Sequence, residues 1–116
     1  MNKRQIGNFY EGAVTEFLKN NGIEIIKRNY YCKLGEIDII ALDGDTLVFI
    51  EVKYRKNANY GRATEVISAT KQKKIIKTAK YYLMCNNTDR KIRFDVVGIT
   101  GNEIEWIQNA FEYIGE

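Results

Sequence analysis

The chain has 116 residues, of which 45% are hydrophobic and 28% charged, and a formal net charge of +3 at pH 7. This length predicts one domain, residues 1–116, and the apolar content suffices for a packed core, which excludes general disorder. No apolar run approaches the roughly 18 residues that a membrane-spanning helix needs, so we expect no membrane partner.

The first predicted element is a helix over residues 4–21. Its apolar residues recur at helical spacing, and the sequence Asn20-Asn21-Gly22 is typical of a helix end. Glu11 is predicted to lie on this helix, well away from the centre of the apolar stripe. That stripe comprises Ile6, Phe9, Tyr10, Ala13, Val14, Phe17 and Leu18.

Three strands are predicted next. Residues 23–31 are rich in β-branched and aromatic side chains, and residues 36–42 alternate acidic and aliphatic ones. Residues 46–54 contain a nearly continuous apolar run, which predicts a central strand buried on both faces. The sequence Asp43-Gly44-Asp45 predicts a hairpin between the second and third strands.

The second half of the chain is predicted to hold one more helical region and two strands. Residues 55–62 are polar and predict a loop, and residues 63–85 have helical periodicity with a break near residues 68–70. Residues 91–99 and 103–107 predict two strands joined by a turn, the last strand being short. The order α-β-β-β-α-β-β therefore predicts an α/β fold in which helices flank a mixed five-stranded sheet.

Three charged residues are predicted to share one patch of this sheet. Side chains alternate along a strand, so Glu51 and Lys53 point the same way, while Asp38 lies opposite Ile37 and Ile39. Depending on the register of the hairpin, position 38 lies nearly opposite position 51, and a suitable register brings all three residues together. Charges beside a buried strand need a compensating partner, which Lys53 or a divalent cation can supply.

Such a patch suits phosphodiester hydrolysis. Two carboxylates can hold a cation that polarises the phosphate, and a lysine can stabilise the developing charge. Glu11 could add a ligand or hold a metal-bound water. The sequence has no histidine and only two distant cysteines, Cys32 and Cys85, which excludes histidine-based catalysis and argues against zinc. We therefore expect oxygen-ligated Mg²⁺ or Mn²⁺.

Other side chains have two open interpretations. The run 71–80 has five lysines and no acid, and it is either a solvated helix face or a phosphate-binding surface. The residues expected to contact nucleic acid are Lys71, Lys74, Lys77 and Arg55. Four tyrosines could stack on unpaired bases, although packing is the favoured interpretation: Tyr54, Tyr60, Tyr81 and Tyr82. A structural salt bridge or hydrogen bond is expected for Asp95, and structural roles for both cysteines.

Two short runs carry a specific resemblance. Residues Gly35-Glu36-Ile37-Asp38 and Phe49-Ile50-Glu51-Val52-Lys53 resemble the motif of the PD-(D/E)XK nucleases, the restriction-endonuclease-like superfamily. Over nearly its whole length the chain is similar to the small bacterial YraN-type family of predicted endonucleases, and more distantly to archaeal Holliday junction resolvases. Ile37 stands where the superfamily has a proline, a replacement that the YraN-type pattern shares.

The resemblance implies a role for each residue of the patch. Asp38 and Glu51 would be metal ligands, Lys53 the catalytic lysine and Glu11 the helix-borne acid. We therefore expect a cytoplasmic, metal-dependent endonuclease that acts on DNA in repair, recombination or uptake. A homodimer is expected if the chain cuts two strands, as resolvases do. The alternative is an inactive module of the same fold that binds nucleic acid or a protein.

Overall fold

The computed structural model describes residues 2–59, 61–65 and 67–112. The helices are α1 (Lys3–Asn20) and α2 (Ala69–Cys85), with a short 3-10 helix, η1 (Ala63–Glu65), between β3 and α2. The strands are β1 (Glu24–Cys32), β2 (Gly35–Asp43), β3 (Thr46–Arg55), β4 (Ile92–Thr100) and β5 (Glu103–Phe111). They form one sheet in the order β1-β2-β3-β4-β5, parallel only between β3 and β4. The predicted α/β order is confirmed.

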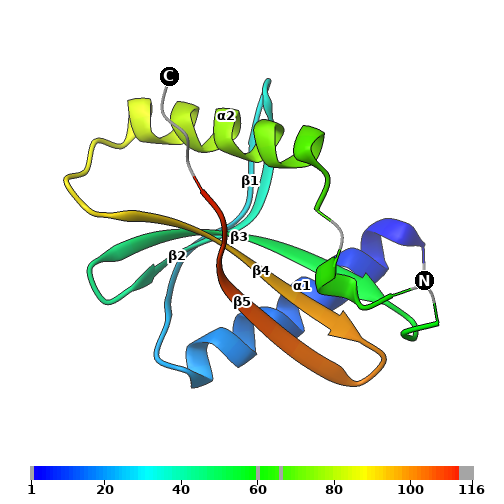
Figure 1. Ribbon diagram of the computed structural model, residues 1–116. Coiled ribbons are helices and arrows are strands. Elements are labelled where there is room, and N and C mark those ends of the chain that lie inside the picture. Colours follow the sequence, from blue (N-terminus) through cyan, green and yellow to red (C-terminus); the bar gives the residue numbers. More distant parts are fainter. Residues whose placement is uncertain (1, 60, 66, 113–116) are drawn as a thin grey trace.

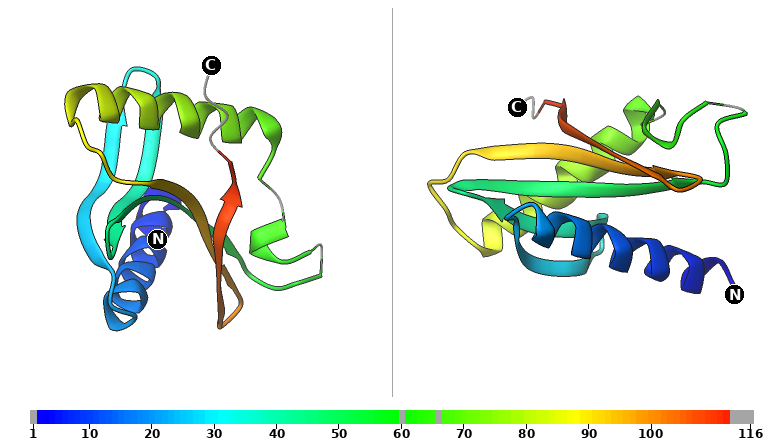
Figure 2. Two further views of the ribbon diagram at one scale, coloured as in Figure 1. Left: turned by 60° about the vertical axis from the view of Figure 1, so that its left-hand side comes forward. Right: turned by 90° about the horizontal axis from the view of Figure 1, so that it is seen from below.

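The two helices cover opposite faces of the sheet, as Figures 1 and 2 show. Beneath α1, Val14 and Leu18 pack with buried residues of β2, β3 and β4. Beneath α2, Ile75 and Ala79 pack with a second buried cluster that includes Phe49 and Phe94. Because β3 contributes to both clusters, its apolar run is buried on both faces, as predicted. No helix of the described residues is long and apolar enough to cross a membrane.

The buried face of α1 differs from the predicted stripe. The buried residues are Glu11, Val14, Thr15 and Leu18, whereas Phe9 is 58% exposed. The prediction that Glu11 lies away from the buried face is therefore wrong. Packing of Val14 and Leu18 against the sheet sets the rotation of the helix, and this rotation turns Glu11 toward the sheet one turn earlier. A carboxyl group tolerates this position only with hydrogen-bond partners, which are described below.

The strands β2 and β3 form the predicted hairpin but separate at its far end. Gly44 has a φ of 60°, which a tight turn between Asp43 and Thr46 requires. The pairing of β2 with β3 ends at Ile39 and Ile50, so position 38 lies opposite position 51 one step beyond it. Beyond this point β2 pairs with β1 alone, and the two strands rise beside α2 (Figure 2, left).

Because the strands separate, one prediction about β2 is wrong. Strict alternation placed Ile37 and Ile39 on the same face, but Ile37 packs beneath α2 and Ile39 beneath α1. The physical reason is that β2 leaves its partner between these two residues and turns. At the same point the backbone N–H of Val52 donates to Asp38 Oδ2 at 2.8 Å, so a side chain accepts the hydrogen bond.

The second half of the chain agrees with the prediction except at its end. The predicted break in the helical region falls at Ser68, whose side chain accepts from the backbone N–H of Lys71 and caps α2. The last strand is longer than predicted, because it continues to Phe111 rather than ending near residue 107. An irregularity in its pairing with β4, where Asn109 has a φ of 54°, allows it to continue. Phe111 then stacks on Phe94.

Candidate active site

The carboxylate of Glu51 lies nearly buried beside two lysines. Glu51 is 6% exposed, and its Oε2 is 3.9 Å from Lys53 Nζ and 3.6 Å from Lys71 Nζ. Lys53 lies two residues further along β3, so its side chain leaves the strand on the same face. Lys71 comes from the first turn of α2, which the crossover between the parallel strands brings over this face. The side chains of both lysines remain more than a third exposed, so they reach solvent from the site.

Asp38 brings a second carboxylate to Glu51. Burial raises the pKa of Glu51 to about 8, and the charge of Asp38 and a hydrogen bond with it add to the rise. Lys71 and Lys53 oppose this rise in the pKa of Glu51 but do not cancel it. Near neutral pH the pair of carboxyl groups therefore retains a proton, because the two lysines do not fully offset two negative charges at this depth.

Glu11 approaches Asp38 from α1. With its amide nitrogen turned toward Glu11, Asn29 of β1 donates to both carboxyl oxygens, at 3.0 and 3.1 Å. Asn29 has a φ of 53°, a left-handed conformation that asparagine tolerates better than most residues. Burial raises the pKa of Glu11 to about 7, the charges of Asp38 and Glu36 add to the rise, and Arg28 lowers it. Three acids thus influence one another across α1 and β2.

A cavity of about 420 Å³ opens on the α1 side of Asp38. Its acidic lining consists of Glu11, Glu36 and Asp38. Among the residues that the structure describes, no group of three or more Asp, Glu or Cys side chains is arranged to hold a metal ion. The carboxyl groups instead interact in succession, with Asp38 between Glu11 and Glu51. The structure thus brings Asp38, Glu51 and Lys53 together, and places Glu11 on the far side of Asp38.

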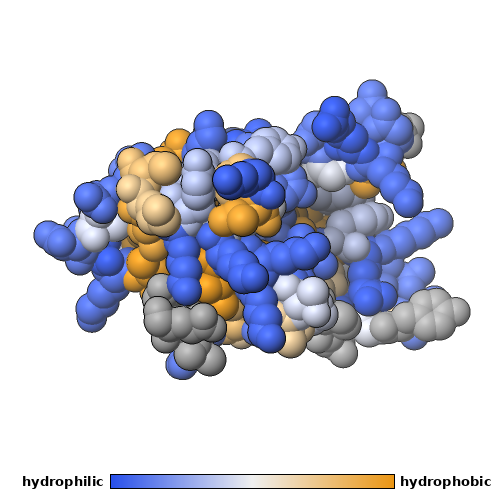
Figure 3. Space-filling view, turned by 90° about the horizontal axis from the view of Figure 1, so that it is seen from above, coloured by the Kyte–Doolittle hydropathy of each residue, from blue (hydrophilic) through white to orange (hydrophobic). Residues whose placement is uncertain are grey.

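The remaining basic candidates occupy different places. Lys74 and Lys77 are exposed further along α2, and neither forms an ion pair with Glu51 within the described part of the chain. Seen from the side of α2, hydrophilic side chains project over most of the surface, with apolar ones between them (Figure 3). Arg55, at the end of β3, lines a separate hollow with Lys53 and Tyr54. Of the four basic residues predicted to contact nucleic acid, only Lys71 lies beside Glu51.

Comparisons with known proteins give this chain a family. Residues 10–99 match the family described as Uncharacterised protein family UPF0102. The chain belongs to the UPF0102 family. A UPF0102 protein of Vibrio parahaemolyticus is 46% identical over 112 residues, 93% of each chain. One of Nitrosospira multiformis is 44% identical over 115 residues, 97% of each chain. The resemblance to the YraN-type family is confirmed at this level, and the matched segment includes Glu11, Asp38, Glu51, Lys53 and Lys71.

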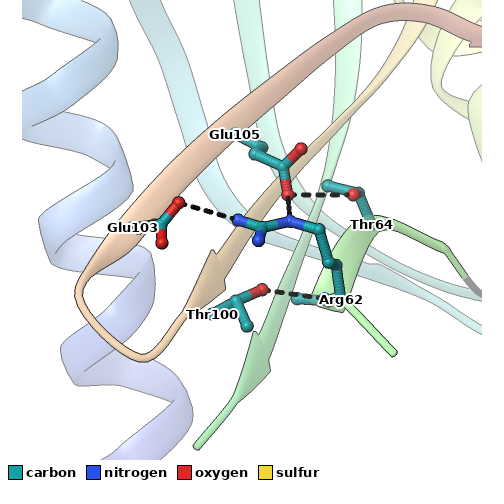
Figure 4. Close-up of polar contacts among 6 residues, drawn as sticks. Arg62, Thr64, Thr100, Glu103 and Glu105 are labelled. Atoms are coloured by element: carbon teal, nitrogen blue, oxygen red, sulfur yellow. Dashed lines mark hydrogen bonds and ion pairs between the residues drawn. The ribbon is translucent and has the colours of Figure 1, made fainter. Parts of the chain in front are cut away.

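The segment between β3 and α2 of this UPF0102 chain is anchored to β5, as Figure 4 shows. Arg62 bonds the carboxylate of Glu105 through Nε and that of Glu103 at 3.2 Å, and the Thr64 hydroxyl donates to Glu105 at 3.4 Å. Close packing adds to these bonds, because a Cβ at Gly98 would lie 2.7 Å from a methyl group of Thr64. The anchored segment leads directly into the first turn of α2, which carries Lys71. Sequence reasoning missed this anchor, although Glu103 and Glu105 share one face of a strand.

Asp95 and Tyr82 have structural contacts. Asp95 is fully buried and accepts bonds from Arg93, from the indole N–H of Trp106 and from the backbone of Asn109, which confirms the expected role. Tyr82 packs edge-to-face against Tyr30 and Phe49, so packing is confirmed there. Tyr60 lies outside the described residues. Cys32 and Cys85 are free thiols.

Proposed function

We propose that this UPF0102 chain is a Mg²⁺- or Mn²⁺-dependent endonuclease of the PD-(D/E)XK type that hydrolyses phosphodiester bonds in DNA. The observation that carries the proposal is the meeting of Asp38, Glu51, Lys53 and Lys71 at the point where β2 leaves β3. Two carboxyl groups and two solvent-reaching lysines suit a phosphate ester held beside a cation. A purely structural ion pair would not need a second carboxyl group that raises the pKa of the first.

The carboxyl pair fits a hard divalent cation. Mg²⁺ usually binds through one or two carboxylates and completes its coordination with water and substrate phosphate, so a cluster of three acids is not required. Asp38 and Glu51 would hold the ion, and the lack of histidine leaves oxygen donors as the ligands. A bound ion would polarise the phosphate and lower the pKa of its water. Its charge would also relieve the repulsion between the two carboxyl groups.

The lysines divide the remaining work. Lys53 would orient the attacking water and stabilise the charge that develops on the phosphate, since its ammonium group lies beside Glu51 and remains 35% exposed. Lys71 would hold the phosphate itself from the α2 side. Lys74 and Lys77 would extend this phosphate contact along the exposed face of α2. Arg55, at the end of β3, would contact the backbone of the DNA.

Glu11 would act on water rather than bind the ion directly. It lies on the far side of Asp38 from Glu51, and Asn29 fixes both of its carboxyl oxygens. With a pKa of about 7 it can accept or donate a proton near neutral pH, which is what the positioning of a water requires. This arrangement favours the role of holding a metal-bound water over that of a third ligand.

Cleavage assays test the proposal. Wild-type protein should cut at least one DNA among linear duplex, single-stranded, flapped and four-way forms when Mg²⁺ or Mn²⁺ is present. D38N and E51Q should each abolish cutting, whereas D45N, at a fully exposed turn residue, should leave it unchanged. The four-way form tests the resolvase resemblance, and sizing the protein by light scattering tests the homodimer. Binding without cutting by the wild-type protein would replace the enzyme with a nucleic-acid-binding module.

A further inference from the structure

The cavity beside Asp38 has an aromatic wall that the proposed hydrolysis does not use. Beside its acids, the lining includes Tyr10 of α1, Tyr31 of β1 and Tyr54 of β3. Tyr31 is 61% exposed and Tyr54 is 38% exposed. Three elements distant in the sequence therefore bring aromatic rings to one hollow, and two of the rings remain accessible to a ligand.

Two of these rings form a rigid platform. Tyr10 and Tyr54 stack with their centroids 3.8 Å apart and their planes 15° from parallel. Phe9 packs against Tyr10 edge-to-face, which supports the platform from outside. Stacked, preformed aromatic side chains bind flat ligands with little loss of conformational freedom. The cavity, at about 420 Å³, falls within the usual range for small-ligand sites.

The charges around this cavity select the part of a nucleotide that it can take. Its lining contains three acids and one basic residue, Arg4, so a phosphate would be repelled there. A nucleobase carries no charge, has a π face for the tyrosines and has polar edges for the surrounding side chains. The lysines that suit phosphate lie on the opposite side of Asp38, beside Glu51.

We infer that this cavity binds an unpaired nucleobase by stacking on Tyr54 and Tyr31, next to the phosphate that Lys71 and the cation on Asp38 and Glu51 would hold. The inference rests on the proposed function, and it makes the substrate class a strand with at least one unpaired nucleotide at the cut site. A base inside a duplex has both faces covered by its neighbours, so it cannot stack on a protein side chain without being turned out. The cavity therefore distinguishes single-stranded or branched nucleic acid from uninterrupted duplex.

Binding measurements with a fluorescent base test this inference without any cleavage. The probes are single-stranded DNA and RNA oligomers that contain 2-aminopurine, and the corresponding duplex, each titrated in Ca²⁺. Wild-type protein should quench the single-stranded probe and bind it more tightly than the duplex. Tyr54→Ala and Tyr31→Ala should each weaken single-strand binding by roughly 5- to 100-fold and reduce the quenching. Tyr81→Ala is the matched control, because Tyr81 does not line the cavity.

The outcomes separate this inference from the proposed function. Since Tyr31 is largely exposed, its removal should leave the melting temperature unchanged, and that variant remains informative even if Tyr54→Ala unfolds. If the substitutions weaken binding of both the DNA and the RNA probe, the site recognises the base alone. If they weaken binding of only one probe, the site is specific for that nucleic acid. Binding and quenching without cleavage would support the base site and count against the nuclease. Cleavage that is unaffected by both substitutions, or a wild type that does not quench, would overturn the base site.

Discussion

Binding of a divalent cation should release a proton from the Asp38–Glu51 pair, so the stabilisation by metal should grow as the pH rises. The pKa of Glu51 is raised to about 8, so near neutral pH the free protein holds a proton that the cation must displace. Below that pKa, one displaced proton makes apparent affinity change about tenfold per pH unit, equivalent to about 1.4 kcal/mol.

The size of the effect follows from linkage. A cation at about 100 times its dissociation constant stabilises the folded state by about 2.7 kcal/mol. For a chain of this size, each kcal/mol raises the melting temperature by roughly 3–6 °C. Saturating Mg²⁺ or Mn²⁺ at pH 8 should therefore raise it by on the order of 10 °C, and by several degrees less at pH 7 for the same metal concentration.

Thermal unfolding with and without the metal, across pH 6 to 9, measures this shift. The double variant D38N/E51Q should show no shift at any pH, because it keeps the shape of both side chains and removes both charges. The matched control is D45N/E24Q, which removes two exposed charges elsewhere. An equal metal-induced shift in both double variants would refute the site. A shift in the wild type that does not change with pH would refute the shared proton.

Three further predictions address the other charged residues. Lys53→Ala should slow single-turnover cleavage roughly 10²–10³-fold while binding in Ca²⁺ persists, and a wild-type rate would make Lys53 structural. The second prediction concerns the triple substitution to alanine of Lys71, Lys74 and Lys77. It should flatten the slope of log affinity for DNA against log salt concentration by about 2–3, whereas an unchanged slope would indicate a solvated face. Because the pKa of Glu11 rises from 4.5 to about 7 on folding, the folded wild type should lose on the order of 2–3 kcal/mol of stability as the pH rises between those two values. Glu11→Gln should reduce the decline in urea unfolding and leave the part that Glu51 causes, whereas Glu16→Gln should leave the decline unchanged. An equal decline in both variants would mean that Glu11 does not contribute.

The order of helices and strands could be predicted because it depends on local patterns. Residues Leu47 to Ile50 form a continuous apolar run, and each is at most 4% exposed in β3. The turn at Gly44 and the cap at Ser68 use residue types whose local chemistry favours those conformations. The meeting of positions 38 and 51 was predicted for one register of the hairpin, and the structure has that register.

The rotation of α1 could not be predicted in the same way. Residue types alone favour burial of Phe9, but the helix buries Glu11 instead. Packing of Val14 and Leu18 sets this rotation, and the buried carboxyl group is tolerated because Asn29 of β1 adopts a left-handed backbone conformation and donates to both of its oxygens. The apolar pattern of a helix contains no information about the strand that packs against it. A polar residue with hydrogen-bond partners on that strand is therefore predicted, wrongly, to face solvent.

The selection of Lys71 from the lysine run also depends on tertiary structure. All five lysines look alike in the sequence, and only the first turn of α2 is carried over Glu51. The Ser68 cap sets where that turn begins, and the Arg62 contacts hold residues before it against β5. The place of Lys71 beside Glu51 is thus a property of how α2 packs on the sheet, which the lysine run itself does not encode.

Asp38 links the fold to the chemistry because one side chain meets both demands. Its Oδ2 accepts the N–H of Val52 where the ladder between β2 and β3 stops, so the strands can separate without leaving a buried donor unpaired. The separation gives its carboxyl group access to Glu51 on the α2 side and to the cavity and Glu11 on the α1 side. In an unbroken ladder, alternation would confine position 38 to one face, and the phosphate and base sites proposed here could not share a carboxylate. This departure from regular β-structure, which sequence periodicity did not predict, is therefore the feature that would let the two proposed sites on opposite faces of the sheet share Asp38.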